Sequence, residues 1–189
     1  LIRCLTLAKT LDKQGANCEF IVRDLEGNIN NLIEENGFNL NVLRTDLDQK
    51  IEYSEKDYST WLGIKKDIDI NQTQRSIIGK KLDWLVVDHY AIDVNWESEL
   101  RENVKKIMVI DDLANRSHDC DILLDQNLGR SENDYFDLVD SQSVKLIGPK
   151  YALLRPEFSF FRPKSIKRKK VIDIKKILIS MGGIDKNNV

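Results

Sequence analysis

Apolar residues recur along the chain in two spacings, and each spacing predicts a different kind of element. From Leu1 to Leu11 they recur at intervals of three and four residues, which predicts an amphipathic helix. Short apolar runs between polar stretches predict buried strands of a parallel sheet. Strands are predicted at 18–23, 38–43, 84–87, 107–110, 122–124, 144–147 and 177–180. Helices are predicted at 1–11, 28–36, 60–80 and 93–103, with a loop at 46–58.

The alternation of strands and helices predicts the fold class. Strands that alternate with helices form right-handed βαβ units, so we expect an α/β fold with a Rossmann-like parallel sheet covered on both faces. Asp93 precedes the helix predicted at 93–103, where an aspartate is a favoured N-cap. The segment 162–170 is strongly basic and contains Pro163, which favours an exposed connector between domains.

Composition narrows the class of protein further. With 189 residues, 41% apolar and 32% charged, the chain can form one domain with a real core, which excludes a disordered or collagen-like chain. A net charge of −2 argues against a general nucleic-acid binder. No apolar run reaches the roughly 20 residues of a membrane span. Three cysteines without a C-x-x-C spacing predict reduced thiols in a cytoplasmic protein, with neither disulfides nor a zinc site.

Polar groups follow four of the predicted strands directly. In open α/β sheets, ligands bind outside the carboxyl ends of the strands. Four such ends in one chain therefore predict that one edge of the sheet is a ligand face. The groups are Asp88-His89-Tyr90, Asp111-Asp112, Asp125-Gln126-Asn127 and Gly182-Gly183-Ile184-Asp185.

The first of these groups, after the strand at 84–87, carries three candidate side chains with open alternatives. His89 is either a general acid or base, or a donor to a sugar or phosphate, or a residue that holds its loop through backbone hydrogen bonds. Tyr90 either stacks on a sugar or is a half-buried packing residue. Asp88 either orients His89 or, as the favoured alternative, caps the next helix.

The other polar groups leave similar alternatives. Asp111 and Asp112 are adjacent, so we expect them to point in different directions and one of them to be structural. His118 lies in a polar stretch and is expected to be exposed, whereas Cys120 is expected to be a core residue. No His, Cys and carboxylate cluster has metal-ligand spacing, so no metal or other cofactor is expected. Gly182 and Gly183 either let backbone N–H groups approach a phosphate or form a turn.

Seven segments, taken together and in this order, resemble a known family. They are Arg-Cys-Leu-Thr-Leu-Ala (3–8), Trp-Leu-Gly (61–63), Asp-His-Tyr (88–90), Ile-Asp-Asp-Leu-Ala-Asn-Arg (110–116), Cys-Asp-Ile-Leu-Leu-Asp-Gln-Asn (120–127), Gly-Pro-Lys-Tyr-Ala-Leu-Leu-Arg-Pro-Glu-Phe (148–158) and Ile-Ser-Met-Gly-Gly-Ile-Asp (179–185). The family is that of the UDP-sugar hydrolases of pseudaminic acid biosynthesis, which is similar to the spore-coat polysaccharide biosynthesis proteins.

The resemblance implies a glycosyltransferase-B-like fold of two Rossmann-like domains. It implies a sugar-facing amino-terminal domain at 1–161, a basic linker at 162–174 and the start of a UDP-binding domain at 175–189. It also implies metal-independent hydrolysis of UDP-2,4-diacetamido-2,4,6-trideoxy-β-L-altropyranose at the anomeric carbon, with inversion. The family's first strand, Gly-rich loop and catalytic histidine have no counterpart in this numbering, so we expect this chain alone to be inactive.

The resemblance also assigns residues to the site. Tyr90 and His89 become the candidate catalytic residues, with Tyr90 the better candidate for a contact to the sugar. Arg3 is expected to support the lost Gly-rich loop. Candidate substrate-binding residues are Arg3, Asp88, Asn127, Arg155, Gly182 and Gly183.

The predicted function is therefore hydrolysis of a UDP-sugar in pseudaminic acid biosynthesis. Two alternatives remain: a UDP-sugar glycosyltransferase of the same architecture, and a non-catalytic nucleotide-sugar-binding module. The expected partner is the UDP-sugar substrate, without nucleic acid or membrane.

Overall fold

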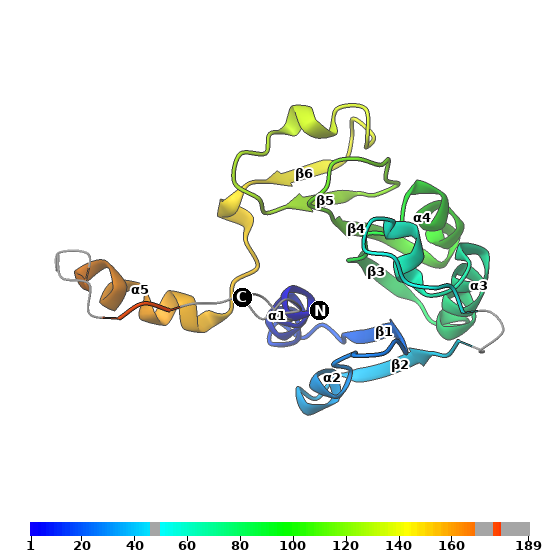
Figure 1. The fold of residues 1–189 in the computed structure, drawn as a ribbon, viewed down its shortest axis with the longest axis horizontal. Helices are drawn as coiled ribbons and strands as arrows, with labels where there is room; N and C mark the ends of the chain where they lie inside the picture. Colours follow the sequence, from blue (N-terminus) through cyan, green and yellow to red (C-terminus); the bar gives the residue numbers. More distant parts are fainter. Residues whose placement is uncertain (46–49, 169–175, 179–189) are drawn as a thin grey trace. The chain divides into compact units, whose positions relative to one another are not determined.

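The structure is a computed structural model that describes residues 1–45, 50–168 and 176–178 (Figure 1). The chain divides into two compact units, Leu1–Leu153 and Leu154–Val189. The first unit contains both sheets, and the second contains helix α5 (Pro156–Arg168). None of the helices in the described ranges is long and apolar enough to cross a membrane.

The strands of the first unit form two parallel sheets, which confirms the predicted α/β class (Figure 1). A two-stranded sheet pairs β1 with β2, and a four-stranded sheet has the order β3-β4-β5-β6. In the larger sheet Val87 lies opposite Val109, and Ile110 lies opposite Leu124, so the polar residues that follow these strands meet at one edge. The strands are β1 (Glu19–Arg23), β2 (Asn39–Leu43), β3 (Leu82–Val87), β4 (Val104–Ile110), β5 (Ile122–Asp125) and β6 (Val144–Ile147).

Helices connect the strands largely where the apolar spacing predicts them. The α-helices of the first unit are α1 (Ile2–Asp12), α2 (Asn31–Glu35), α3 (Lys66–Ile77) and α4 (Val94–Leu100). Short 3-10 helices in the described residues are η2 (Tyr58–Leu62), η3 (Arg101–Asn103), η4 (Glu132–Tyr135) and η5 (Pro149–Tyr151). The expected N-cap is confirmed, because the Asp93 carboxylate accepts hydrogen bonds from the backbone N–H groups of Asn95 and Trp96.

The prediction of a single helix at 60–80 is wrong, because η2 and α3 divide this segment. Gly63 separates η2 from α3 with a φ of 70°, a left-handed conformation that interrupts a helix and favours glycine. A Cβ atom at this position would lie 2.6 Å from Cδ2 of Leu25, a side-chain end that can move, so the left-handed φ is the main reason for glycine. The helix predicted at 93–103 similarly ends as α4 and continues as η3.

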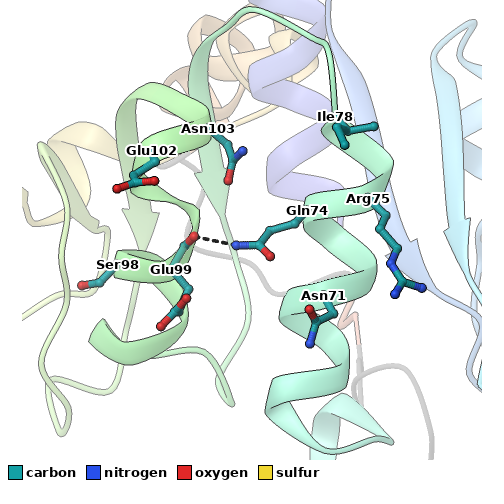
Figure 2. A pocket seen from close by; sticks show the side chains of 8 residues that line it. All are labelled: Asn71, Gln74, Arg75, Ile78, Ser98, Glu99, Glu102 and Asn103. Carbon is teal, nitrogen blue, oxygen red and sulfur yellow. Dashed lines mark hydrogen bonds between the residues drawn. The ribbon is translucent and has the colours of Figure 1, made fainter.

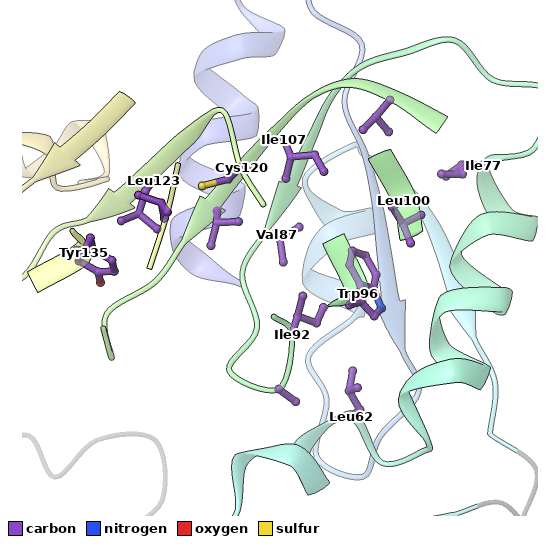
Figure 3. Packing of buried hydrophobic residues seen from close by; sticks show 14 residues of the cluster. Leu62, Ile77, Val87, Ile92, Trp96, Leu100, Ile107, Cys120, Leu123 and Tyr135 are labelled. Carbon is purple, nitrogen blue, oxygen red and sulfur yellow. The ribbon is translucent and has the colours of Figure 1, made fainter. Parts of the chain in front are cut away.

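The first unit has two hydrophobic clusters. The larger one lies against the four-stranded sheet, with Trp96 and Leu100 of α4 beside Ile77 of α3 (Figure 3). Cys120 belongs to this cluster, as expected. The smaller cluster joins α1, α2 and the two-stranded sheet, and its buried members are Leu5, Ala8, Ile33 and Phe38.

A buried ion pair connects the two sheets through the helices. The Arg23 guanidinium at the end of β1 lies 2.5 Å from the Asp69 carboxylate of α3, and both side chains are only 6% exposed. The Trp96 indole N–H donates to the other Asp69 oxygen at 2.9 Å. Because the charges are paired and hydrogen-bonded, the pair can remain buried at low cost.

The second unit differs from the sequence expectation in its local structure. Residues 162–168 of the expected basic linker belong to α5, a helix that the apolar spacing did not predict. Residues 169–174 lie outside the described residues. Of the strand predicted at 177–180, residues 177 and 178 are described and have no regular structure.

Candidate functional site

Polar residues gather where β3 and β4 end. Asp88 and Tyr90 follow β3, Asp112 follows β4, and Arg3 reaches them from α1. We call Arg3, Asp88, Tyr90 and Asp112 the Arg3 cluster. It lies at the carboxyl ends of parallel strands, which is where open α/β sheets bind ligands.

Arg3 is the centre of this cluster because it bridges two carboxylates. Its Nε donates to both oxygens of Asp88 at 3.1 and 3.0 Å, and its Nη2 lies 2.5 Å from Asp88 Oδ1. Its Nη1 donates to Asp112 Oδ2 at 3.0 Å. The planar guanidinium therefore fixes the two strand ends relative to α1. The expectation that Asp88 caps the next helix is wrong, since Asp93 caps α4 and Asp88 binds Arg3.

The charges of the cluster stabilise one another. Burial raises the pKa of Asp88, but the hydrogen bonds and the charge of Arg3 outweigh it and hold this pKa below its usual range. Burial lowers the pKa of Arg3, and the bonds to Asp88 and Asp112 outweigh it in turn. Both groups are therefore charged at neutral pH. Asp112 Oδ1 is buried with no hydrogen-bond partner among the described residues.

Cys4 acts as a hydrogen-bond donor to the cluster. Its Sγ lies 3.1 Å from Asp88 Oδ2, and burial together with the Asp88 charge raises the pKa of the thiol to about 12. Because the thiolate is the nucleophilic form, a thiol held neutral in this way is unreactive.

Tyr90 connects the cluster to aromatic side chains. Its ring centroid lies 5.2 Å from that of Tyr58 and 5.5 Å from that of Trp61. Burial and the interaction of its hydroxyl with Asp112 raise the pKa of Tyr90 to about 12. Tyr90 is therefore a neutral phenol that can donate or accept a hydrogen bond but is not a base at neutral pH.

His89 has the contacts of a residue that holds its loop. Its Nδ1 accepts a hydrogen bond from the Ala91 backbone N–H at 3.1 Å, and the ring also bonds to the backbone of Trp61. Burial lowers the pKa of His89, so the imidazole is neutral. The His89 ring thus interacts with the backbone of two residues, which favours the loop-holding alternative.

Asn127 lies next to the cluster through the backbone. Its side-chain amide donates to the Asp112 carbonyl oxygen at 3.2 Å, and its backbone N–H donates to Asp125 Oδ1 at 2.8 Å. Arg155 is exposed and belongs to the second unit. Gly182 and Gly183 lie outside the described residues.

A second polar network adjoins the Arg3 cluster, since Asp111 precedes Asp112 in the chain. The two carboxylates at its centre, Asp111 and Asp125, are fully buried. Asp111 accepts hydrogen bonds from Arg116 at 2.8 Å and from the Tyr135 hydroxyl at 3.0 Å. The same hydroxyl lies 2.9 Å from Asp125 Oδ2, which also lies 3.2 Å from Arg130. Sequence reasoning missed Tyr135 and Arg130, because both follow β5 in a polar stretch whose pattern does not indicate that it folds back onto the ends of β4 and β5.

The expectation of an exposed His118 is wrong. Its side chain is fully buried, and its Nδ1 lies 2.7 Å from Glu97 Oε1 on α4, which is also fully buried. The other Glu97 oxygen accepts from the Asp119 backbone N–H at 2.7 Å. The polar stretch around His118 does not indicate that its side chain is buried, because its partner Glu97 lies 21 positions earlier in the chain.

Arg116 ties the buried network to the loop that follows β3. Its guanidinium donates to the backbone carbonyls of Ile92 at 2.7 Å and of His89 at 3.3 Å, besides its bond to Asp111. Ala114, in the same loop as Asp111, has a φ of 51° and donates its N–H to Asp111 Oδ2. A left-handed alanine costs about 1–2 kcal/mol, so the backbone of this loop is strained at Ala114 while it makes the hydrogen bond to Asp111.

A polar groove of about 640 Å³ lies elsewhere, between α3 and α4 (Figure 2). Gln74 crosses it and donates to the Glu99 carbonyl oxygen at 2.8 Å. The groove shares no residue with the Arg3 cluster, and its lining presents no convergent set of titratable groups. The lining residues are Asn71, Gln74, Arg75, Ile78, Ser98, Glu99, Glu102 and Asn103.

The strand ends carry several carboxylates, and carboxylate oxygens are common metal ligands. Within the described ranges, no group of three or more His, Cys, Asp or Glu side chains could hold a metal ion. Arginines occupy the space between the carboxylates instead, as Arg3 does between Asp88 and Asp112.

The parallel sheets and their polar edge define a Rossmann-like α/β protein. No family model matches the chain. Over 111 residues, or 58% of the chain, it is 36% identical to the UDP-2,4-diacetamido-2,4,6-trideoxy-beta-L-altropyranose hydrolase of Campylobacter jejuni, of which 38% is covered. Over 190 aligned residues, or 99% of the chain, it is 27% identical to an uncharacterized protein of Methanocaldococcus jannaschii, of which 34% is covered. The chain thus spans little more than a third of the length of these curated relatives.

Proposed function

We propose that this chain contributes the sugar-binding part of a nucleotide-sugar hydrolase that releases UDP from a UDP-2,4-diacetamido-2,4,6-trideoxyhexose. The observation that carries the proposal is the Arg3 cluster at the carboxyl ends of β3 and β4. Charged and neutral hydrogen-bonding groups converge there on one edge of a parallel sheet. Partial identity to a relative that bears the name of such a hydrolase supports this choice of substrate.

In this proposal the cluster binds and orients the sugar, and a water molecule attacks the anomeric carbon. Asp88 and Asp112 would accept hydrogen bonds from sugar hydroxyl or amide groups, while Arg3 holds the carboxylates charged and in place. Tyr90, a neutral phenol, would donate to the sugar. In this proposal His89 positions the loop that carries Tyr90, because the His89 ring interacts with backbone groups.

The domain organisation is part of the same proposal. We propose that residues 1–161 form the sugar-facing domain, that 162–174 lead out of it, and that a UDP-binding domain begins at 175–189. Arg155, Gly182 and Gly183 would then contribute to the nucleotide side of the site.

The test is UDP release from the UDP-trideoxy sugar by the gene product that contains this chain. With water as the only acceptor, a hydrolase releases UDP and free sugar, and Tyr90→Phe, which removes one hydrogen bond to the sugar, lowers kcat about tenfold. Phe136→Leu is a matched control, since Phe136 is 77% exposed and belongs to neither polar network. UDP release only on addition of a sugar acceptor would identify a glycosyltransferase. Binding without release in either case would identify a binding module, and both results overturn the proposal.

A further inference from the structure

Tyr90 of the Arg3 cluster lies in a group with three further aromatic rings, and the proposed catalytic steps do not use these three. The four, which we call the aromatic cluster, are Tyr53, Tyr58, Trp61 and Tyr90. Trp61 is at the centre, with ring centroids 5.6 Å from Tyr53, 5.0 Å from Tyr58 and 5.5 Å from Tyr90. The rings come from two segments far apart in the chain, the 51–62 segment and the loop after β3.

The segment that carries three of these rings is held by its own hydrogen bonds. The Trp61 indole N–H donates to the Ser54 carbonyl oxygen at 2.9 Å, and Thr60 bonds to the backbone of Ser54. The Ile51 backbone N–H donates to the Gly63 carbonyl oxygen at 2.9 Å, which closes the segment. A segment fixed in this way presents its rings in a set orientation and loses little entropy when a ligand binds.

One ring of the cluster is exposed, and the other three are half-buried. Trp61 packs against the larger hydrophobic cluster, so its burial has a structural explanation. Tyr53 is 60% exposed and makes its ring contact only with Trp61 among the ring pairs of the described residues. An exposed aromatic side chain on a fixed segment is typical of a binding surface, where it supplies contact area at low entropic cost.

The polar neighbours indicate what would lie on these rings. Tyr90 belongs to both groups, since its ring contacts Tyr58 and its hydroxyl interacts with Asp112. A hexose matches this arrangement, because one face of the ring and its methyl substituents are apolar whereas its edge carries hydroxyl or amide groups. The aromatic cluster would contact the face and methyl groups, and the carboxylates would contact the edge.

We infer that the aromatic cluster is the subsite for the apolar face and methyl groups of the sugar, an inference that rests on the proposed function. Tyr53 and Tyr58 then determine which sugars bind, and the Arg3 cluster determines how they are oriented. A sugar whose C6 is a methyl group and whose C2 and C4 carry acetamido groups would bind more tightly than one with hydroxyl groups at these positions.

Binding of the UDP-trideoxy sugar and of UDP alone to Tyr53→Ala tests the inference. The loss of one aromatic contact worth about 0.5–1.5 kcal/mol predicts a 2- to 12-fold weaker Kd for the UDP-sugar and an unchanged Kd for UDP. Tyr53→Phe keeps the ring and should bind normally. Phe136→Ala removes another exposed ring, outside the aromatic cluster, and should have no effect.

Saturation-transfer NMR supplies a second readout that does not depend on substitution. Irradiation of the aromatic protons of the protein should transfer most strongly to the sugar methyl protons. Strongest transfer to the uracil protons would instead place the base on the rings and overturn the inference.

The two proposals fail in different ways. If UDP-sugar binding and hydrolysis persist unchanged in Tyr53→Ala and Tyr58→Leu, the subsite is wrong and the proposed function stands. If the wild-type protein neither binds nor cleaves the UDP-sugar, the proposed function is wrong. The subsite is then decided with methyl 2-acetamido-2-deoxyglucoside, and the absence of aromatic transfer to its acetamido methyl group overturns it.

Discussion

Asp111 and Asp112 are neighbours in the chain, yet their side chains lie in different surroundings. Asp111 is fully buried and satisfied by Arg116, Tyr135 and the Ala114 backbone. Asp112 is 18% exposed, shares Arg3 with Asp88, and has one oxygen without a hydrogen-bond partner among the residues that the structure describes. Successive side chains at a strand end point to opposite sides, so one carboxylate can hold the fold while the next is left for a ligand. Adjacent positions of one strand end therefore have different surroundings, and the proposed function gives a binding role to only one of them.

The largest expected effect separates the two carboxylates directly. Asp111→Ala leaves the Arg116 guanidinium without its buried partner, so we expect a loss of about 3–5 kcal/mol in the free energy of unfolding. Asp112→Ala should cost about 1 kcal/mol or less, because Arg3 retains Asp88 and both groups are partly exposed. Urea unfolding followed by circular dichroism measures both, and equal losses would contradict the division.

Tyr135→Phe sharpens the comparison within the buried network. The change removes one hydroxyl that serves Asp111 and Asp125, and leaves oxygens of both carboxylates without this donor. We expect a loss of about 1–3 kcal/mol in the free energy of unfolding. UDP-sugar affinity should not change at temperatures where the variant is folded. Phe136→Leu, one residue along and exposed, is the control.

Asp88→Asn tests the partly exposed network through pH. The pKa of Asp88 is lower in the folded chain than in the unfolded chain, so the charged pair with Arg3 stabilises the fold above the unfolded pKa of about 3.9. This stabilisation is lost as the pH falls through the folded pKa. The wild-type protein should therefore exceed Asp88→Asn by about 1 kcal/mol at pH 7, with the difference declining below pH 4. A difference that stays constant down to pH 2 would show that the charge of Asp88 does not matter.

Ala114→Gly is expected to have the smallest effect, and of opposite sign. Glycine adopts a φ of 51° without the steric cost that alanine has there, although it gains entropy in the unfolded chain. We expect a net gain of about 0.5 kcal/mol in stability. The melting temperature measures it, and a decrease would show that the contact of the Ala114 methyl group with the larger cluster outweighs the strain.

Local signals in the sequence predicted much of the fold. The apolar runs gave β5 and β6 to within a residue, and the position of Asp93 before an apolar spacing predicted the cap of α4. Gly63 lies inside the predicted helix, but a glycine alone does not end a helix. The left-handed φ of 70° that separates η2 from α3 is a property of the folded chain, so one helix was predicted where there are two.

The site was predicted less well, because its contacts join distant residues. Strand ends identified Asp88, Tyr90 and Asp112 as polar groups on one edge of the sheet. The partner of Asp88 is Arg3, 85 residues earlier, so a capping role looked better from local spacing. His118 was misjudged for the same reason, since Glu97 buries it from another element. Nothing in the sequence marked Tyr53 as a site residue, because its contact with Trp61 exists only in the folded chain.

Arg3 connects elements that pack in two different hydrophobic clusters. Its helix α1 packs in the smaller cluster, whereas Asp88 and Asp112 end strands that pack in the larger one. The ion pairs of Arg3 therefore join the two hydrophobic clusters within one compact unit, as the Arg23–Asp69 pair also does. A ligand that competes with Arg3 for Asp88 or Asp112 would weaken this connection, and a ligand that bridges Arg3 and these carboxylates would strengthen it. Ligand binding at these carboxylates and the stability of the first unit are then thermodynamically linked, so each alters the other by the same free energy.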